Sequence, residues 1–185
     1  MTGYYSNEER KILLDLARNT IVKYIEDGII SDFNTDNNKF LEKRGVFVTL
    51  HKSSSLRGCI GYPLPIKILK TAVIDNSISA AFEDPRFPPV LLNEINDIEI
   101  EISVLTVPQR VNDPNEVNVG KDGIIISNGH NRGLLLPQVP VEQGWDLDEY
   151  LSYGCMKAGL PKDLWKNGAM IETFQAEVFS EKDFK

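Results

Sequence analysis

Cysteine and histidine are scarce in this sequence, with two of each among 185 residues. Two cysteines are too few for a disulfide framework and fit a reducing compartment, so we expect a cytoplasmic protein. The longest aliphatic runs, at 123–126 and 134–136, are far shorter than the ~20 residues of a membrane span. The first residues have neither a basic start nor an apolar stretch, so no signal peptide is expected either.

The sequence also lacks the short motifs that mark common catalytic and cofactor sites. It has no Walker loop, no GxGxxG, no GxSxG and no HExxH, which removes the simplest support for nucleotide-dependent and common hydrolase chemistry. The soft metal ligands show no close zinc-type spacing. They are Cys59, Cys155, His51 and His130. We therefore predict neither a cofactor nor a metal site.

Acidic residues outnumber basic ones by 27 to 20, which gives a net charge of −7. This argues against bulk nucleic-acid binding, because basic residues must displace counterions from the phosphates. The segment 39–57 differs, since its five basic residues and one acidic residue leave a net +4. Such a segment fits a cationic patch for a small anionic ligand or an acidic partner. It equally fits a solvated surface whose charges pair with nearby carboxylates.

The hydrophobic pattern predicts alternating helices and strands. With 42% hydrophobic residues, a chain of this length buries roughly 70% of its unfolded surface, enough for one core. A capping box at Ser6 and Glu9 opens a helical pattern that ends near Gly28. The other elements expected are helices at 66–82 and 147–158, strands at 45–51, 56–62 and 98–104, a hairpin of 123–127 with 133–139, and one strand at 170–180. We predict an α+β fold with a mostly antiparallel sheet flanked by helices.

The segment LRGCIG at 56–61 holds the densest chemistry in the chain. Side chains alternate along a strand, so Arg57, Cys59 and Gly61 share one face. Positive charge on Arg57 and a helix N-terminus a few residues later favour the thiolate, and Gly58 and Gly61 leave room for a substrate. Free cysteine is also among the most buried residue types, so an inert packed thiol is the alternative.

Nucleophilic catalysis needs a base, and the sequence offers few candidates. A hairpin places His51 within reach of Cys59, whereas His130 falls in a polar turn. Glu99 and Glu101 share the face opposite the neighbouring isoleucines. They form either a carboxylate pair at a cleft or an ordinary solvated strand face.

Six segments along the chain form a specific combination, although each of them alone is weak. They are LRGCIG at 56–61, DPRFPP at 84–89, EISVLT at 101–106, GLLLPQV at 133–139, QGWD at 143–146 and CMKAGLP at 155–161. Together they resemble the AMMECR domain family, in the form of its prokaryotic branch that carries Cys155. The resemblance covers nearly the whole chain.

The resemblance implies one AMMECR domain over 1–185 with two lobes and a cleft. In this arrangement the N- and C-terminal segments share the larger lobe, and the cysteine motif lies near the cleft. Implied partners are a Memo-type protein and a radical-SAM protein, the other components of the AmmeMemoRadiSam system. The family has no established reaction, and His51 and His130 lie outside its motifs. The thiol therefore needs help from Asp84, Arg86 or Glu101.

Two functions stay open at this point. In the first, the chain is an enzyme or enzyme component that binds a small anionic or nucleobase-like ligand, with Cys59 as nucleophile and Arg57 as anion clamp. The predicted binding residues are Arg57, Gly58, Gly61, Arg86, Glu101 and Cys155. In the second, it is a non-catalytic adaptor for a partner protein or RNA, and LRGCIG is only a tightly packed strand. Glycines flanking a cysteine beside an arginine favour the first.

Overall fold

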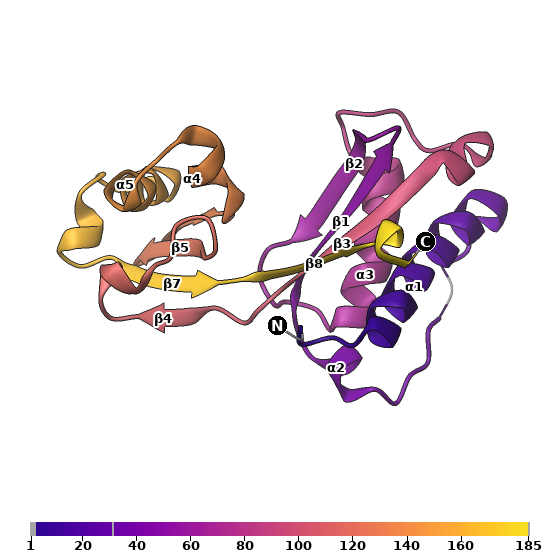
Figure 1. The fold of residues 1–185 in the computed structure, drawn as a ribbon, viewed down its shortest axis with the longest axis horizontal. Coiled ribbons are helices and arrows are strands. Elements are labelled where there is room, and N and C mark those ends of the chain that lie inside the picture. The colour runs from indigo at the N-terminus through magenta and orange to yellow at the C-terminus, as the bar shows by residue number, and fades with distance from the viewer. Residues whose placement is uncertain (1–2, 31, 185) are drawn as a thin grey trace. The chain divides into compact units, whose positions relative to one another are not determined.

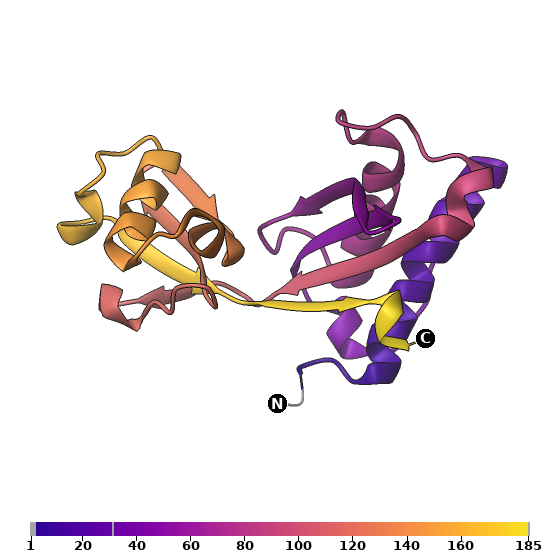
Figure 2. The same ribbon diagram turned by 45° about the horizontal axis from the view of Figure 1, so that its top comes forward.

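The computed structural model describes residues 3–30 and 32–184. The chain divides into two compact units (Figures 1 and 2). The larger unit joins the segment that ends at Leu105 to the segment that starts at Glu177, and the smaller unit is Thr106–Ala176. Each unit has its own antiparallel sheet and its own helices. The α+β fold predicted from the hydrophobic pattern is therefore confirmed.

A four-stranded sheet with helices on one face forms the larger unit. The strand order is β2-β1-β3-β8, so β2 lies at an edge. The strands are β1 (Gly45–Lys52), β2 (Ser55–Tyr62), β3 (Ile98–Leu105) and β8 (Ala176–Ser180). Alternate side chains of β1 and β3 enter a core shared with helices α1 (Asn7–Asp27) and α3 (Leu69–Ile78). The side chains between them lie on the opposite face of the sheet, where they are half-buried.

Helix α1 begins and ends where its capping residues predict. The Glu9 amide donates to Ser6 Oγ at 3.2 Å, and the Ser6 amide donates to Glu9 Oε2 at 2.8 Å. These two bonds satisfy amides that the first turn leaves free. At the other end Gly28 has a φ of 67°, a left-handed conformation that stops the helix.

Helix α3 is shorter than the predicted range of 66–82. It begins at Leu69, because the chain bends at 63–65, where Pro63 and Pro65 lack the N–H groups of a helix, and Ile66 is 56% exposed. Its last turn widens into the π-helical segment η1 (Ser79–Glu83). Three further short helices of this unit were not predicted. They are α2 (Asn38–Leu41), η2 (Leu92–Asp97) and η5 (Glu181–Phe184).

The smaller unit has the antiparallel strand order β4-β7-β5-β6. Its strands are β4 (Gln109–Val111), β5 (Gly123–Asn128), β6 (Asn131–Leu135) and β7 (Met170–Phe174). Strands β5 and β6 form the predicted hairpin, and helix α5 (Leu147–Lys157) supplies buried side chains to the core. The second hairpin strand was predicted to reach 139, but it stops at Leu135. The remaining helices are η3 (Pro114–Glu116), α4 (Gln138–Gln143) and η4 (Leu164–Lys166).

The prediction of one strand over 170–180 is wrong. This segment forms β7 and β8, which belong to different sheets in different units. The break falls at Gln175, whose amide donates to Thr106 Oγ1 at 2.9 Å and whose carbonyl accepts from the Thr106 amide at 2.8 Å. Apolar and polar residues alternate on both sides of Gln175, so the pattern alone does not reveal the break.

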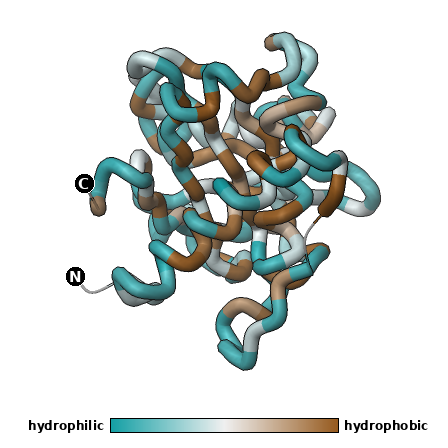
Figure 3. The backbone as a smooth tube through the Cα atoms, turned by 90° about the vertical axis from the view of Figure 1, so that its right-hand side faces the viewer, coloured by the Kyte–Doolittle hydropathy of each residue, from teal (hydrophilic) through white to brown (hydrophobic). Residues whose placement is uncertain are grey.

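Hydrophobic residues are distributed over many short elements. Figure 3 shows hydrophobic stretches of the backbone interrupted by hydrophilic ones. Within residues 3–30 and 32–184, no helix is both long enough and apolar enough to cross a membrane.

Candidate functional site

Cys59 lies on the half-buried face of the larger unit's sheet, opposite the helices. The antiparallel registers place Cys59 opposite Thr49, and Thr49 opposite Glu101. These side chains form one row across three strands, with about 5 Å between neighbours. The next row on this face holds His51 opposite Glu99. We call these five residues the Cys59 face; all are neither fully buried nor fully exposed.

The thiol of Cys59 has one hydrogen-bond donor on this face. Thr49 Oγ1 donates to Cys59 Sγ at 3.3 Å. Glu99 is engaged elsewhere, because Lys182 Nζ lies 2.9 Å from its carboxylate. Among the described residues, no side-chain hydrogen bond reaches Glu101 or His51, so both keep polar atoms available to a ligand. Nucleophilic cysteines commonly have such donors and acceptors nearby.

An ion pair from the DPRFPP segment, between the buried Asp84 and the exposed Arg86, fixes the backbone of Cys59. Because β2 is an edge strand, its outer backbone groups need partners from outside the sheet. The Cys59 amide donates to Asp84 Oδ2 at 2.9 Å, and Arg86 Nη2 donates to the Cys59 carbonyl at 3.1 Å. Arg86 also donates to both Asp84 oxygens, from Nη2 at 2.7 Å and from Nε at 2.9 Å. At Cys59 the ion pair thus replaces a neighbouring strand.

This arrangement sets the charges beside the thiol. Asp84 is only 4% exposed, and its hydrogen bond with Arg86 holds the pKa of the carboxyl well below its usual range. The same hydrogen bond raises the pKa of Arg86, whose side chain is 54% exposed. Of the two predicted arginines, Arg86 is therefore the one that presents a permanent positive charge to solvent.

Arg57 is committed to a different partner. Its Nη2 and Nε donate to the Glu94 carboxylate at 2.7 and 3.3 Å, and Lys52 Nζ donates to the same group at 2.8 Å. These hydrogen bonds, that from Arg57 above all, lower the pKa of Glu94 to about 2. The β1–β2 register shifts between Leu50 and His51, which makes Arg57 the extra residue of a bulge. With 12% of its side chain exposed, Arg57 has little surface left for an anion.

Most of the positive charge in the segment 39–57 is neutralised by carboxylates. The ion pairs are Lys39–Glu9, Arg44–Glu42, Lys52–Glu94 and Arg57–Glu94. Lys43 is the basic residue of this segment that has no ion pair within the described chain. Of the two interpretations, a paired surface is the one the structure supports, and the cationic patch is not formed.

Both glycines of the motif are explained by packing. A Cβ on Gly58 would lie 2.1 Å from the carbonyl oxygen of Ala80, because η1 packs directly on β2. A Cβ on Gly61 would lie 2.3 Å from the ring of Phe47. We predicted that Gly58 and Gly61 leave room for a substrate, but protein atoms occupy the space next to both glycines.

The second cysteine and the second histidine lie in the smaller unit. Cys155 is fully buried in α5, and burial raises the pKa of its thiol. His130 is exposed in the turn between β5 and β6. The binding role of Cys155 stays a prediction, and its burial favours a packing role. In the part of the chain that the structure describes, no three His, Cys, Asp or Glu residues are placed to hold a metal ion.

Thr49 and Glu94 are the contacts that sequence reasoning missed. The predicted strands at 45–51 and 56–62 imply a register that places a residue near 49 opposite Cys59. The contact of Thr49 with Cys59 could therefore have been predicted from the sequence. That of Glu94 with Arg57 could not, because Glu94 lies in an unpredicted helix 37 residues from Arg57.

Comparison with known proteins places this arrangement among close relatives. Residues 14–179 match the family described as AMMECR1. Protein MK0488 of Methanopyrus kandleri is 48% identical over 186 residues, covering 95% of this chain and 90% of its own. Protein MJ0810 of Methanocaldococcus jannaschii is 53% identical, covering 77% and 75%. The crystal structure of the uncharacterised protein PH0010 from Pyrococcus horikoshii matches with a TM-score of 0.75 and 44% identity, covering 92% and 90%.

Proposed function

This chain belongs to the AMMECR1 family, and we propose that its Cys59 face binds a small anionic ligand next to a nucleophilic thiol. One observation carries this proposal. The exposed guanidinium of Arg86 donates to the Cys59 carbonyl at 3.1 Å, so a positive charge is held at the backbone of the residue that carries the half-buried thiol. The buried Asp84 keeps both groups in place.

Arg86, rather than Arg57, is the proposed anion-binding residue. Its Nη1 makes no hydrogen bond to any described residue, and its side chain is 54% exposed. The Nη1 of Arg57 also has no partner among these residues, but it is buried. An exposed guanidinium with an open N–H suits a carboxylate or phosphate oxygen. Thr49 and Glu101 then supply a hydroxyl and a carboxylate along the row for the polar groups of the same ligand.

The proposed covalent step is addition of the thiolate to a carbonyl group of the ligand. The sulfur forms a bond to the carbonyl carbon, and the π electron pair moves onto the carbonyl oxygen. The thiol proton passes to solvent before the attack. Arg86 stabilises the negative charge that develops on oxygen, as a positioned cation does in acyl-transfer sites.

Alkylation with two reagents of equal size tests this proposal. Iodoacetate is anionic and iodoacetamide is neutral, so the ratio of their rates at Cys59 reports positive potential at the sulfur. We expect this ratio to exceed that of glutathione. Arg86→Gln should lower it about two- to fivefold, the effect of one charge at short range in a wet site, and Arg86→Lys should retain most of it.

Two features of the chain provide controls. Cys155 is fully buried and should resist both reagents until the protein unfolds, so labelling in the folded state reports Cys59. Arg132→Gln removes an arginine of similar exposure from the smaller unit, where Arg132 pairs with Glu172. An unchanged ratio in Arg86→Gln, or an equal change in Arg132→Gln, contradicts the proposal.

The second candidate function is a non-catalytic adaptor. It is supported by the packing of Phe47 against Gly61, which fills space on the thiol's face of the sheet with the protein's own atoms. Its partners would be the Memo-type and radical-SAM proteins that the family resemblance implies. This function predicts that Cys59→Ser leaves co-purification with those partners intact, while reversing the charge of the exposed Lys43 weakens it.

A further inference from the structure

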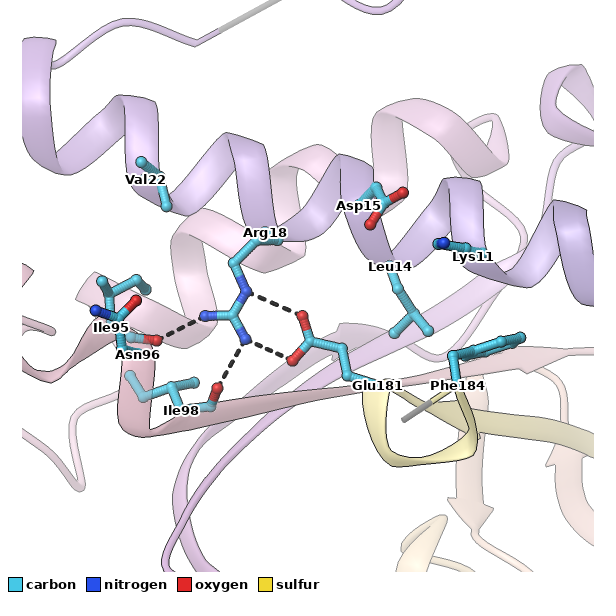
Figure 4. Close-up of a pocket in the computed structure, with 10 residues that line it drawn as sticks. All are labelled: Lys11, Leu14, Asp15, Arg18, Val22, Ile95, Asn96, Ile98, Glu181 and Phe184. Carbon is cyan, nitrogen blue, oxygen red and sulfur yellow. Dashed lines mark hydrogen bonds and ion pairs between the residues drawn. The ribbon is translucent and has the colours of Figure 1, made fainter.

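A cavity of about 350 Å³ lies on the helical side of the larger unit, on the other side of the sheet from the Cys59 face (Figure 4). Helix α1 forms one wall, η2 and the start of β3 form a second, and η5 closes the end. Leu14, Ile98 and Phe184 supply apolar surface. Arg18 and Glu181 lie at its centre.

Four of the five N–H groups of the Arg18 guanidinium donate hydrogen bonds to protein atoms. Nε and Nη2 donate to the two oxygens of Glu181 at 2.9 and 2.5 Å. Nη1 donates to the Ile95 carbonyl and Nη2 to the Ile98 carbonyl, both at 2.7 Å. Figure 4 shows these partners arranged around the rim of the guanidinium. Among the described residues, only the second N–H of Nη1 has no acceptor in this plane.

The faces of this guanidinium remain available. The Arg18 side chain is 24% exposed and lines the cavity, although four of its five in-plane donors are occupied. A guanidinium is planar and delocalised, so its face attracts an aromatic ring through cation–π and stacking interactions. We propose that this cavity binds a neutral, planar heteroaromatic ring of the nucleobase type, stacked on the face of Arg18.

Polar side chains at the rim of the cavity can form hydrogen bonds with the edge of such a ring. Lys11, Asp15 and Asn96 line it, and in the described chain none of their side chains is hydrogen-bonded or ion-paired. Lys11 and Asp15 are four residues apart on α1, in the orientation less favourable for pairing. Ammonium, carboxylate and amide groups together offer the donors and acceptors that a heteroaromatic edge requires.

Charge and size narrow the ligand further. The two basic residues of the cavity, Lys11 and Arg18, are balanced by the two acidic ones, Asp15 and Glu181. A neutral ring is therefore favoured over a multiply charged anion. A volume of about 350 Å³ lies near the lower end of the range for ligand pockets, roughly 300–1,000 Å³. It suits a single base or nucleoside rather than a dinucleotide.

Titration of the isotope-labelled full chain with adenosine, followed by NMR, tests this inference. We expect concentration-dependent shifts of backbone amides at 11–22 and 95–98. Ribose alone, which has no planar ring, should leave them unchanged. Lys11→Ala and Asp15→Ala should each weaken adenosine binding about two- to tenfold, the effect of one hydrogen bond.

Exposed residues of the same helix give matched controls. Lys23→Ala and Asp27→Ala remove the same charges outside the cavity and should not change adenosine binding. Arg18→Lys keeps the charge but removes the planar face, and it should abolish binding. Because Arg18 also anchors η5, the Lys11 and Asp15 variants decide the matter if Arg18→Lys does not fold.

Three results overturn the inference. They are no shifts with adenosine up to its solubility limit, equal shifts with ribose, and shifts confined to residues outside the cavity. None of these results bears on Arg86 and Cys59. This inference can therefore fail while the proposed anion site is supported, and the anion site can fail while this inference is supported.

Discussion

Asp84 accepts the Cys59 backbone amide hydrogen at 2.9 Å while remaining 4% exposed. The bond joins two motifs that are 25 residues apart in sequence, LRGCIG and DPRFPP. It also ends the sheet at β2, because side chains of DPRFPP occupy the place of a further strand there. The two motifs therefore form one structural unit around the thiol.

Removal of the Asp84 carboxylate should destabilise the larger unit. In Asp84→Ala the Cys59 amide and Arg86 lose their acceptor, so we expect the unfolding free energy in urea to fall by about 1.5–3 kcal/mol. Asp84→Asn keeps a neutral acceptor and should cost less. Asp97→Ala, an exposed aspartate of η2, should have almost no effect. Equal losses for Asp84 and Asp97 would show that the bond contributes nothing.

Glu94 should make stability depend on pH in the acid range. Its pKa is lowered to about 2 in the folded protein, chiefly by Arg57, from an ordinary value near 4.5. A lowered pKa means that the carboxylate stabilises the fold fully above about pH 4.5 and that this contribution disappears as pH falls towards 2. Glu94→Gln should thus cost about 1–2 kcal/mol at neutral pH, allowing for solvent screening, and progressively less below pH 4.5.

Denaturation of both proteins at several pH values measures this difference. Glu142→Gln, on an exposed residue of α4 with no ion pair in the described chain, is the control and should give no pH-dependent difference. A difference between wild type and Glu94→Gln that stays constant from pH 7 to pH 2 would contradict the predicted role of Glu94.

Alanine should be tolerated far less at Gly58 than at Gly154. The new Cβ at Gly58 meets the backbone oxygen of Ala80 at 2.1 Å, which cannot move without shifting η1. At Gly154 the nearest atoms, at 2.8 Å, are the flexible ends of Ile124 and Ile126, and alanine also favours the helix. We expect thermal unfolding to show a loss of about 1–3 kcal/mol for Gly58→Ala and little change for Gly154→Ala. The reverse order would be incompatible with the packing of η1 on β2.

The hydroxyl of Tyr150 should stabilise the smaller unit. Tyr150 is fully buried, and its hydroxyl lies 3.1 Å from the Asp122 carbonyl and 3.2 Å from the Leu135 carbonyl. Tyr150→Phe removes this buried donor, at a cost of about 1–2 kcal/mol in chemical denaturation. Tyr153→Phe changes a 42% exposed residue of the same helix and should leave stability unchanged. Equal unfolding free energies for the two variants would show that the Tyr150 hydroxyl does not stabilise the smaller unit.

Local pattern predicted the elements of this protein better than it predicted their ends. The capping box at Ser6 located the start of α1, and alternation identified β3, because both signals lie within a few adjacent residues. The mixed apolar and polar pattern over 170–180 carries no signal at Gln175, so it could not separate β7 from β8. That division depends on pairing with strands far away in sequence.

Local pattern likewise predicted some features of the candidate site and not others. The register of two neighbouring strands places Cys59 beside Thr49, and alternation places Glu101 on their face. The choice between the two arginines was not accessible in this way. Arg57 is neutralised by Glu94, and Arg86 is oriented by Asp84, through contacts that only folding creates.

Sequence alone determined the fold class and the position of the thiol along an extended strand, since both follow from residue types at short spacing, and six segments along the chain carried the resemblance to its family. Tertiary structure decided that protein atoms fill the space beside Gly58 and Gly61, and that Arg86 and not Arg57 is exposed to solvent. It also decided where the last predicted strand divides into β7 and β8. The physical reason is that the Cys59–Asp84 hydrogen bond and the Arg57–Glu94 ion pair join groups 25 and 37 residues apart, and no local periodicity encodes such distances.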